Sequence, residues 1–192
     1  YVALMPGSRK QEIRYLAEPF ILAAKAMLQS RPDLKFITSH VNEKRYEEFQ
    51  EYVEQMAPEL PLEFFTRRSQ DVLAAADVVM VTSGTATLET MLYKKPMVIA
   101  YRMSSLTYRL AKWLVKTPFI GLPNLLANRL IVPELIQEAV TPAAIATTLL
   151  EYLNHPEKTA QLVQTYRELH ETLRMDSARE IADAVFSVAQ QK

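Results

Sequence analysis

The residues best suited to chemistry lie between Asp77 and Glu89, in the stretch DVVMVTSGTATLE. Val78 to Val81 is a short β-branched run, typical of a strand buried on both faces. A small polar turn, Thr82 to Thr85, follows it, and the next apolar residues recur at helical spacing. This order favours an anion, because the first N–H groups of a helix have no partner within the helix.

Four residues of this block are candidates for ligand contact. Ser83, Gly84 and Thr85 can present hydroxyl and N–H groups, and Glu89 lies one helical turn further on, where its carboxylate can accept hydrogen bonds from ligand hydroxyls. Gly84 is one of only three glycines, which indicates a backbone requirement. An ordinary strand-to-helix turn with a capped helix fits the same residues, so the block alone leaves both interpretations open.

A second turn of the same kind lies near the start of the chain. Pro6, Gly7, Ser8 and Arg9 end an apolar run from Tyr1, and a helical pattern follows. Free N–H groups beside a guanidinium suit a diphosphate, although a plain turn with a surface arginine would have the same sequence. Neither a Walker loop nor a GxGxxG fingerprint occurs.

Strand-like and helical patterns alternate over the first 120 residues. Strands are expected at 1–5, 34–38, 62–65, 78–81, 97–101 and 119–122, with helices between them and a kink or break at Pro19. From Thr141 the patterns are helical only, with helices from 142, over 156–173 and over 177–190. The sequence therefore predicts one doubly wound α/β domain, with a parallel sheet of about six strands and a carboxyl-terminal helical tail.

In such a sheet, ligands bind beyond the carboxyl ends of the strands. This rule brings together the turns at 6–9, 39–42, 66–69, 82–85 and 102–105, three of which contain an arginine. The edge as a whole suits a phosphorylated ligand better than either turn does alone.

Composition excludes several other classes of function. Lysine plus arginine and aspartate plus glutamate both number 22, so overall charge does not indicate a nucleic-acid partner, and without cysteines there are no disulfides or thiolate metal sites. His40, His155 and His170 have no metal-binding spacing and are expected at surface or helix positions. No apolar run reaches the roughly 18 residues of a membrane span, no signal peptide is visible, and Ser83 lacks the GxSxG context of a hydrolase.

The segment MSSLTYRLAKWLVK, at 103–116, is amphipathic. At helical spacing its apolar residues share one face and its basic residues another: Leu106, Leu110, Trp113 and Leu114 against Arg109, Lys112 and Lys116. Such a helix can lie on an anionic membrane surface or hold an acyl-phosphate substrate. A helix packed on the core with a solvated basic face has the same pattern and is the favoured interpretation.

The last predicted helix carries an apolar stripe formed by Ile181, Val185 and Val188. This stripe packs either on its own domain or on a partner, which would be a missing domain or a second copy of the chain. Residues 1–173 are accordingly expected to form the ligand-binding domain and 174–192 a separate helix. Because the chain starts within a predicted strand, we expect it to be part of a longer protein.

Three blocks together resemble one family. MPGSRKQEI, VTSGTATLETMLYKKPMVIAYR and LPNLLANRLIVPELIQE occur in the order found in lipid-A-disaccharide synthase, over roughly 1–173. Cousins of the central block occur in peptidoglycan glycosyltransferases and UDP-sugar epimerases, and the third block narrows the choice. The family has the GT-B fold of two facing Rossmann-like halves, and this chain resembles the carboxyl-terminal half, which binds the nucleotide-sugar donor.

The resemblance implies a reaction and a location. The acylated sugar of UDP-2,3-diacylglucosamine would pass to 2,3-diacylglucosamine 1-phosphate, giving a β-1,6-linked disaccharide and UDP. The protein would be peripheral on the cytoplasmic face of a bacterial inner membrane. No metal or other cofactor is expected, in line with the missing DxD motif, and positive groups with helix N-termini would neutralise the departing diphosphate.

The family's motifs also imply binding roles for ten residues. Phosphate contacts are expected from Gly7, Ser8, Arg9, Ser83, Gly84 and Thr85, and ribose contacts from Glu89. Contacts with donor or product are expected from Asn124, and weaker ones from Arg102 and Gln137.

No residue matches the acidic residue thought to act as base, which the family places in the other domain with the acceptor site. The chain alone is therefore expected to bind UDP or its sugar without catalysing transfer. Another UDP-sugar enzyme of the same fold, such as an epimerase or a peptidoglycan-type glycosyltransferase, and a non-catalytic nucleotide-binding module remain as alternatives.

Overall fold

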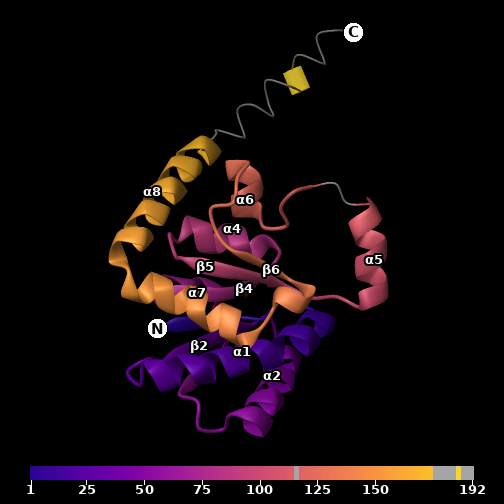
Figure 1. Cartoon of the computed structure of the whole chain (residues 1–192), viewed down its shortest axis with the longest axis vertical. Helices are drawn as coiled ribbons and strands as arrows, with labels where there is room; N and C mark the ends of the chain where they lie inside the picture. The colour runs from indigo at the N-terminus through magenta and orange to yellow at the C-terminus, as the bar shows by residue number, and fades with distance from the viewer. Residues whose placement is uncertain (115–116, 175–184, 187–192) are drawn as a thin grey trace.

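The computed structural model describes residues 1–114, 117–174 and 185–186. Six parallel strands form one sheet in the order β3-β2-β1-β4-β5-β6, with helices on both faces (Figure 1). The strands are β1 (Val2–Met5), β2 (Phe36–His40), β3 (Leu62–Thr66), β4 (Val78–Thr82), β5 (Met97–Tyr101) and β6 (Glu134–Ile136). The predicted doubly wound, Rossmann-like α/β fold is confirmed.

The helices form two layers around this sheet. One face is covered by α1 (Lys10–Ser30), α2 (Glu43–Met56) and α7 (Pro142–Asn154), and the other by α3 (Ser69–Ala75), α4 (Thr85–Leu92) and α8 (Pro156–Leu173). The remaining helical elements are α5 (Ser105–Leu114), α6 (Leu122–Ala127) and the 3₁₀ turn η1 (Gln137–Ala139). Among the described helices, none is long and apolar enough to cross a bilayer.

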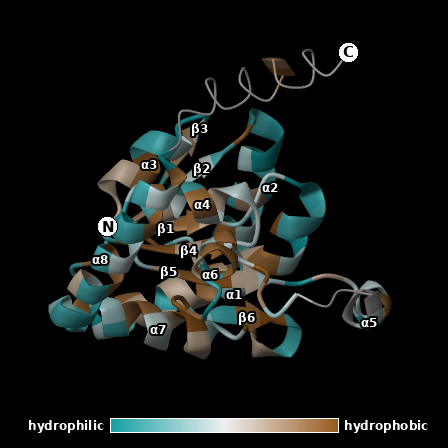
Figure 2. Ribbon diagram, turned by 90° about the horizontal axis from the view of Figure 1, so that it is seen from above, coloured by the Kyte–Doolittle hydropathy of each residue, from teal (hydrophilic) through white to brown (hydrophobic). Residues whose placement is uncertain are grey.

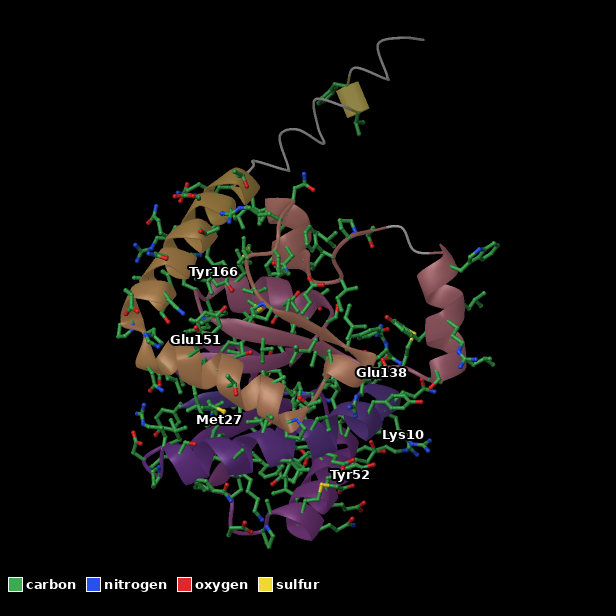
Figure 3. The ribbon with its side chains drawn as sticks, viewed as in Figure 1. Lys10, Met27, Tyr52, Glu138, Glu151 and Tyr166 are labelled. Carbon is green, nitrogen blue, oxygen red and sulfur yellow. The ribbon has the colours of Figure 1, made fainter. Side chains whose placement is uncertain are left out.

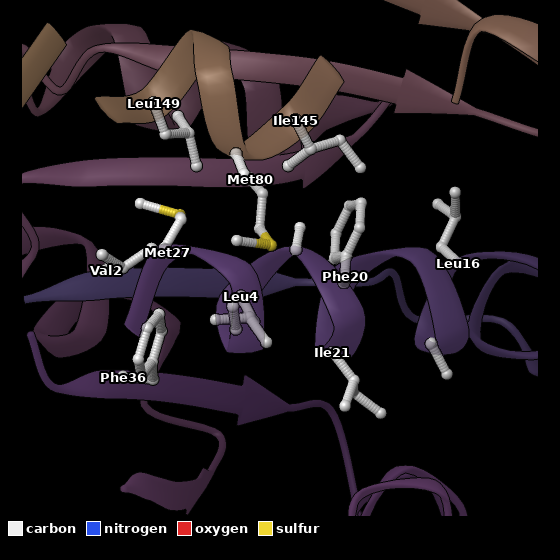
Figure 4. Packing of buried hydrophobic residues seen from close by; sticks show 14 of the residues in the cluster. Val2, Leu4, Leu16, Phe20, Ile21, Met27, Phe36, Met80, Ile145 and Leu149 are labelled. Atoms are coloured by element: carbon white, nitrogen blue, oxygen red, sulfur yellow. The ribbon is translucent and has the colours of Figure 1, made fainter. Parts of the chain in front are cut away.

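Alternate residues of each strand belong to two different hydrophobic cores, because successive side chains of a strand point to opposite faces of the sheet. Leu4 and Met80 pack with Phe20 of α1 and Ile145 of α7 on one side (Figure 4). On the other side, the neighbouring strand positions pack with Tyr166, which faces the sheet from α8 (Figure 3). Burial on both faces explains why the central strands are continuous apolar runs in the sequence.

The strand predicted at 119–122 is wrong. Gly121 instead precedes α6, Pro123 lies in the first turn of that helix, and the N–H groups of Ile120 and Gly121 donate to the carboxylate of Glu134. The sixth strand is β6, which pairs with β5 at the sheet edge. A proline at the start of α6 fits the helix, since its missing N–H would have had no partner there.

Two further predictions concern helices. The break at Pro19 is absent, because α1 runs from Lys10 to Ser30 with Pro19 buried inside it. The helix predicted over 177–190 lies outside the described residues except for Val185 and Phe186, so its stripe at Ile181 and Val188 stays a prediction.

Candidate functional site

A cleft of about 510 Å³ lies at the carboxyl ends of β1, β2 and β4. The chain builds the sheet outwards from β1 in both directions, and a crevice opens where the strand order reverses between β1 and β4. Seven of the predicted site residues line this one cleft: Gly7, Ser8, Arg9, Ser83, Gly84, Thr85 and Glu89.

The loop after β1 is organised by Glu12, which the sequence analysis missed. The Glu12 carboxylate accepts hydrogen bonds from the N–H groups of Ser8 (2.9 Å) and Arg9 (3.0 Å), and from the Arg9 guanidinium (2.8 Å). Gly7 has φ +113°, and a Cβ there would lie 2.6 Å from the Cβ of Glu12, so both backbone conformation and space require glycine. The signal that could have found Glu12 is its position three residues after the helix cap, the spacing of a capping box.

Arg9 remains available to a ligand despite this contact. Its side chain is 81% exposed, and only one of its guanidinium nitrogens binds Glu12. A guanidinium has five N–H donors, so the rest of the group can form paired hydrogen bonds with phosphate oxygens.

The loop after β4 leads directly into α4. Gly84 caps the helix with its backbone, and its carbonyl accepts hydrogen bonds from the N–H and hydroxyl of Thr87. Thr85 and Ala86, the first residues of α4, line the cleft, where the N-terminal end of the helix dipole favours negative charge. The Ser83 hydroxyl donates to the carbonyl of Ile120 at 2.8 Å, which leaves its oxygen as an acceptor only.

His40 forms part of the cleft wall at the end of β2, so its predicted surface or helix position is wrong. The ring packs among Tyr46, Phe49 and Phe64, and burial lowers the histidine pKa from 6.5 to about 4. Its Nδ1 atom and the Thr82 hydroxyl are buried without a hydrogen-bond partner in the described part of the chain. His155 and His170 lie at the start and in the last turn of α8, as expected.

Asn124 does not line the cleft. It is fully buried, its Nδ2 donates to the Val132 carbonyl and to Glu134, and its Oδ1 accepts from the N–H groups of Ile131 and Val132. These four hydrogen bonds tie α6 to the segment that enters β6. The structure thus shows a structural use of Asn124, and its predicted ligand contact stays a prediction.

Arg102 and Gln137 also lie outside the cleft, where hydrogen bonds link the two residues and their neighbours. The Arg102 guanidinium donates to the carbonyls of Gln137 (3.1 Å) and Val140 (2.6 Å). The Gln137 side chain exchanges two hydrogen bonds with the backbone of Met103, and Gln137 adopts φ +53°. The pair fixes the junction between β5 and α5.

The helix predicted around 103–116 is present as α5, but its favoured placement on the core is wrong. Leu106, Leu110 and Trp113 are 80%, 59% and 79% exposed. Figures 1 and 2 both show α5 standing apart from the sheet and its covering helices. Lys116 lies outside the described residues.

Within the ranges the structure covers, no group of three or more histidine, aspartate or glutamate side chains could hold a metal ion. The cleft lining contains two carboxylates, Glu12 of α1 and Glu89 of α4, and two cations, Arg9 and Arg67. This mixture suits a ligand with phosphate groups and hydroxyls.

Two solved structures illustrate the likeness of fold. The pneumococcal O-GlcNAc transferase GtfA in complex with UDP and GlcNAc matches with a TM-score of 0.59, 12% identity, and coverage of 96% of this chain and 35% of that one. A putative UDP-N-acetylglucosamine 2-epimerase from Listeria monocytogenes matches with a TM-score of 0.55, 12% identity, and coverage of 85% and 39%. These likenesses define the class of fold: a Rossmann-like half of the GT-B type.

The family described as lipid-A-disaccharide synthetase matches residues 1–186. Lipid-A-disaccharide synthases from Pasteurella multocida and Pseudomonas paraeruginosa are 44% and 46% identical over 196 and 191 residues, covering 100% of this chain and 50% of each relative. The chain belongs to the lipid-A-disaccharide synthetase family. It spans about half the length of these curated relatives.

Proposed function

We propose that this chain is the donor-binding half of a lipid-A-disaccharide synthase and that its cleft binds UDP-2,3-diacylglucosamine. The observation that carries the proposal is that the two loop-to-helix turns, after β1 and after β4, meet in one cleft with Arg9 exposed at its edge. The family membership supports the chemistry of the ligand.

In the proposed complex, the diphosphate lies between the Arg9 guanidinium and the N-terminus of α4. Gly84 and Thr85 contact its oxygens, and Ser83 joins them once its hydroxyl leaves the Ile120 carbonyl to which it donates. Glu89, half-buried one turn inside α4, accepts hydrogen bonds from the ribose hydroxyls. The Glu12 carboxylate already accepts hydrogen bonds from the N–H groups of Ser8 and Arg9, so the first loop contributes mainly through the Arg9 side chain.

The reaction breaks the bond between the donor's anomeric carbon and the diphosphate oxygen. The acceptor's 6-hydroxyl oxygen, from 2,3-diacylglucosamine 1-phosphate, forms the new bond to that carbon, and its proton passes to a base that we expect in the amino-terminal half of the protein. UDP leaves with the bonding electrons. Arg9 and the dipole of α4 stabilise the negative charge that develops on the departing diphosphate, without a metal ion.

The proposed setting is the cytoplasmic face of a bacterial inner membrane, with the amino-terminal half as the structural partner. A different UDP-sugar enzyme of this fold, such as an epimerase, would need acid–base side chains in the cleft. Of the cleft-lining groups that the structure describes, His40 is 2% exposed among aromatic side chains, and the Glu12 carboxylate already accepts hydrogen bonds from Ser8 and Arg9. Glu89 then has no acid–base partner among them, which favours the transferase.

Calorimetric titration of UDP into the chain tests the donor site. We expect binding in the micromolar-to-millimolar range, weakened by about 1–3 kcal/mol in each of Arg9→Ala and Glu89→Ala. EDTA should leave the affinity unchanged. Arg14→Ala and Glu18→Ala, exposed positions on α1, are the matched controls and should bind as the parent does.

Two results would count against the proposal. Unchanged affinity in folded Arg9→Ala and Glu89→Ala would show that UDP binds elsewhere. A full-length relative that keeps its transferase activity with both substitutions would favour a non-catalytic nucleotide-binding module.

A further inference from the structure

Helix α5 exposes an apolar stripe that the rest of the described chain does not cover. Leu106, Leu110 and Trp113 recur at helical spacing on one side, and Arg109 lies beside them, also exposed. Single exposed apolar residues are ordinary, but three neighbouring large ones on an isolated helix mark a contact surface. This apolar stripe is therefore a surface on which a binding partner is expected.

The charge of the surrounding sequence identifies the chemistry of this partner. Over 103–116, the segment that contains α5, the chain has three lysine and arginine residues and no aspartate or glutamate, although the whole chain is neutral. The local excess of positive charge attracts an anionic surface, and it opposes contact with a second copy of the same segment. An apolar stripe flanked by cations is the pattern of a helix that lies in the interface of an anionic bilayer.

The residue types agree with that setting. Tryptophan prefers the headgroup level of a bilayer, and an arginine beside an apolar stripe can keep its charged end in water while its methylene stem lies on lipid. Helix α5 starts four residues after the end of β5, at the same edge of the sheet as the cleft. A bilayer that binds α5 would therefore meet the side of the molecule on which the cleft opens.

We propose that α5 is an interfacial membrane helix, with Leu106, Leu110 and Trp113 in the acyl–headgroup boundary of a bilayer rich in acidic phospholipid. This inference deepens the proposed function, because acylated donor and acceptor would then reach the cleft from the membrane on which the protein lies. The membrane contact itself does not require nucleotide.

Trp113 is the chain's only tryptophan, so intrinsic fluorescence reports on α5 directly. With vesicles of phosphatidylcholine and phosphatidylglycerol, we expect a blue shift of its emission, weaker binding at high salt, and little response to phosphatidylcholine alone. The double variant Leu106→Ser/Leu110→Ser should lower the partition coefficient about tenfold or more, because it removes most of the apolar area. Leu173→Ser, at an exposed leucine at the end of α8, is the matched control.

Three outcomes would overturn the proposal: no emission shift with either vesicle, undiminished binding of the double variant, or a shift that depends on protein concentration without vesicles. The last would identify a second copy of the chain as the partner. UDP titration of the same variants separates this test from that of the donor site, since loss of vesicle binding with intact UDP affinity supports the α5 assignment independently. Vesicle binding by a parent chain that shows no affinity for UDP would count against the donor site alone.

Discussion

At the scale of single residues, Glu12 shows how the first loop is prepared. Its side chain is only 12% exposed, and its carboxylate accepts hydrogen bonds from the N–H groups of Ser8 and Arg9. From the sequence, these N–H groups were expected to be free to bind phosphate. The anion is therefore expected nearer α4, with Arg9 reaching across from the first loop. Glu12 also restrains Arg9, and a restrained guanidinium loses less rotamer entropy when a ligand binds.

His40 provides a test of stability against pH. Burial lowers its folded pKa to about 4 from 6.5, so the unfolded chain binds more protons between these values. Its contribution to the free energy of unfolding is fully present above pH 6.5 and falls as the pH drops towards 4, by about 3 kcal/mol in total. Urea denaturation across this pH range should show the loss.

The control for this prediction is a pair of variants. His40→Gln should lack the His40 part of the pH dependence, whatever its absolute stability, and His155→Gln, at an exposed histidine, should retain it. An identical pH dependence in His40→Gln and the parent would mean that other groups cause the loss.

At this scale, seven cleft residues were predictable because two motifs each combine a turn, small residues and a helix start. Glu12 and His40 were missed for a physical reason. Their roles depend on what folds around them: the carboxylate turns back onto its own loop, and the imidazole is enclosed by rings from α2 and β3. The environment of His40 leaves no short motif in the sequence, and Glu12 leaves only the capping-box spacing from Arg9.

At the scale of elements, the connection from β5 to β6 is held by a few buried polar groups. Asn124 and Glu134 together satisfy four backbone N–H groups, those of Ile120, Gly121, Ile131 and Val132. Strand β6 has three half-buried residues, too few to produce an alternating pattern, whereas the more apolar run at 119–122 resembles a strand. That contrast explains why the sixth strand was predicted in the wrong place.

The Asn124 network gives a prediction at this scale. Asn124→Ala should lower the free energy of unfolding by about 3 kcal/mol, because the N–H groups of Ile131 and Val132 and the Val132 carbonyl lose their side-chain partner, and Glu134 loses one of its donors. Leu125→Ala, a part-exposed neighbour on α6, should cost less than about 1 kcal/mol. Urea denaturation measures both.

UDP titration of the same Asn124→Ala protein decides between its two roles. A structural asparagine leaves the UDP affinity of the folded variant unchanged. A clear loss of affinity would instead support the ligand contact implied by the family motif, and would mean that the α6 segment rearranges when UDP binds.

At the scale of the whole molecule, residues of this chain line the proposed donor cleft, and the base is expected elsewhere. We therefore predict that the purified chain forms no disaccharide from labelled donor and acceptor, although it binds UDP. A full-length relative, such as the Pasteurella multocida enzyme, is the positive control in the same assay. Turnover by the chain alone would place the base among the residues described above.

The strand order has a consequence for how the protein folds. Val2 of β1 pairs with Val78 of β4 as well as with Phe36 of β2, so the innermost strand is completed by a segment far along the chain. Closing such a long loop is slow compared with forming the local β1–α1–β2 unit. The two halves of the cleft therefore meet late in folding. UDP bound as proposed would need both halves, so it would stabilise the native state by mass action and leave the earlier steps of folding unassisted.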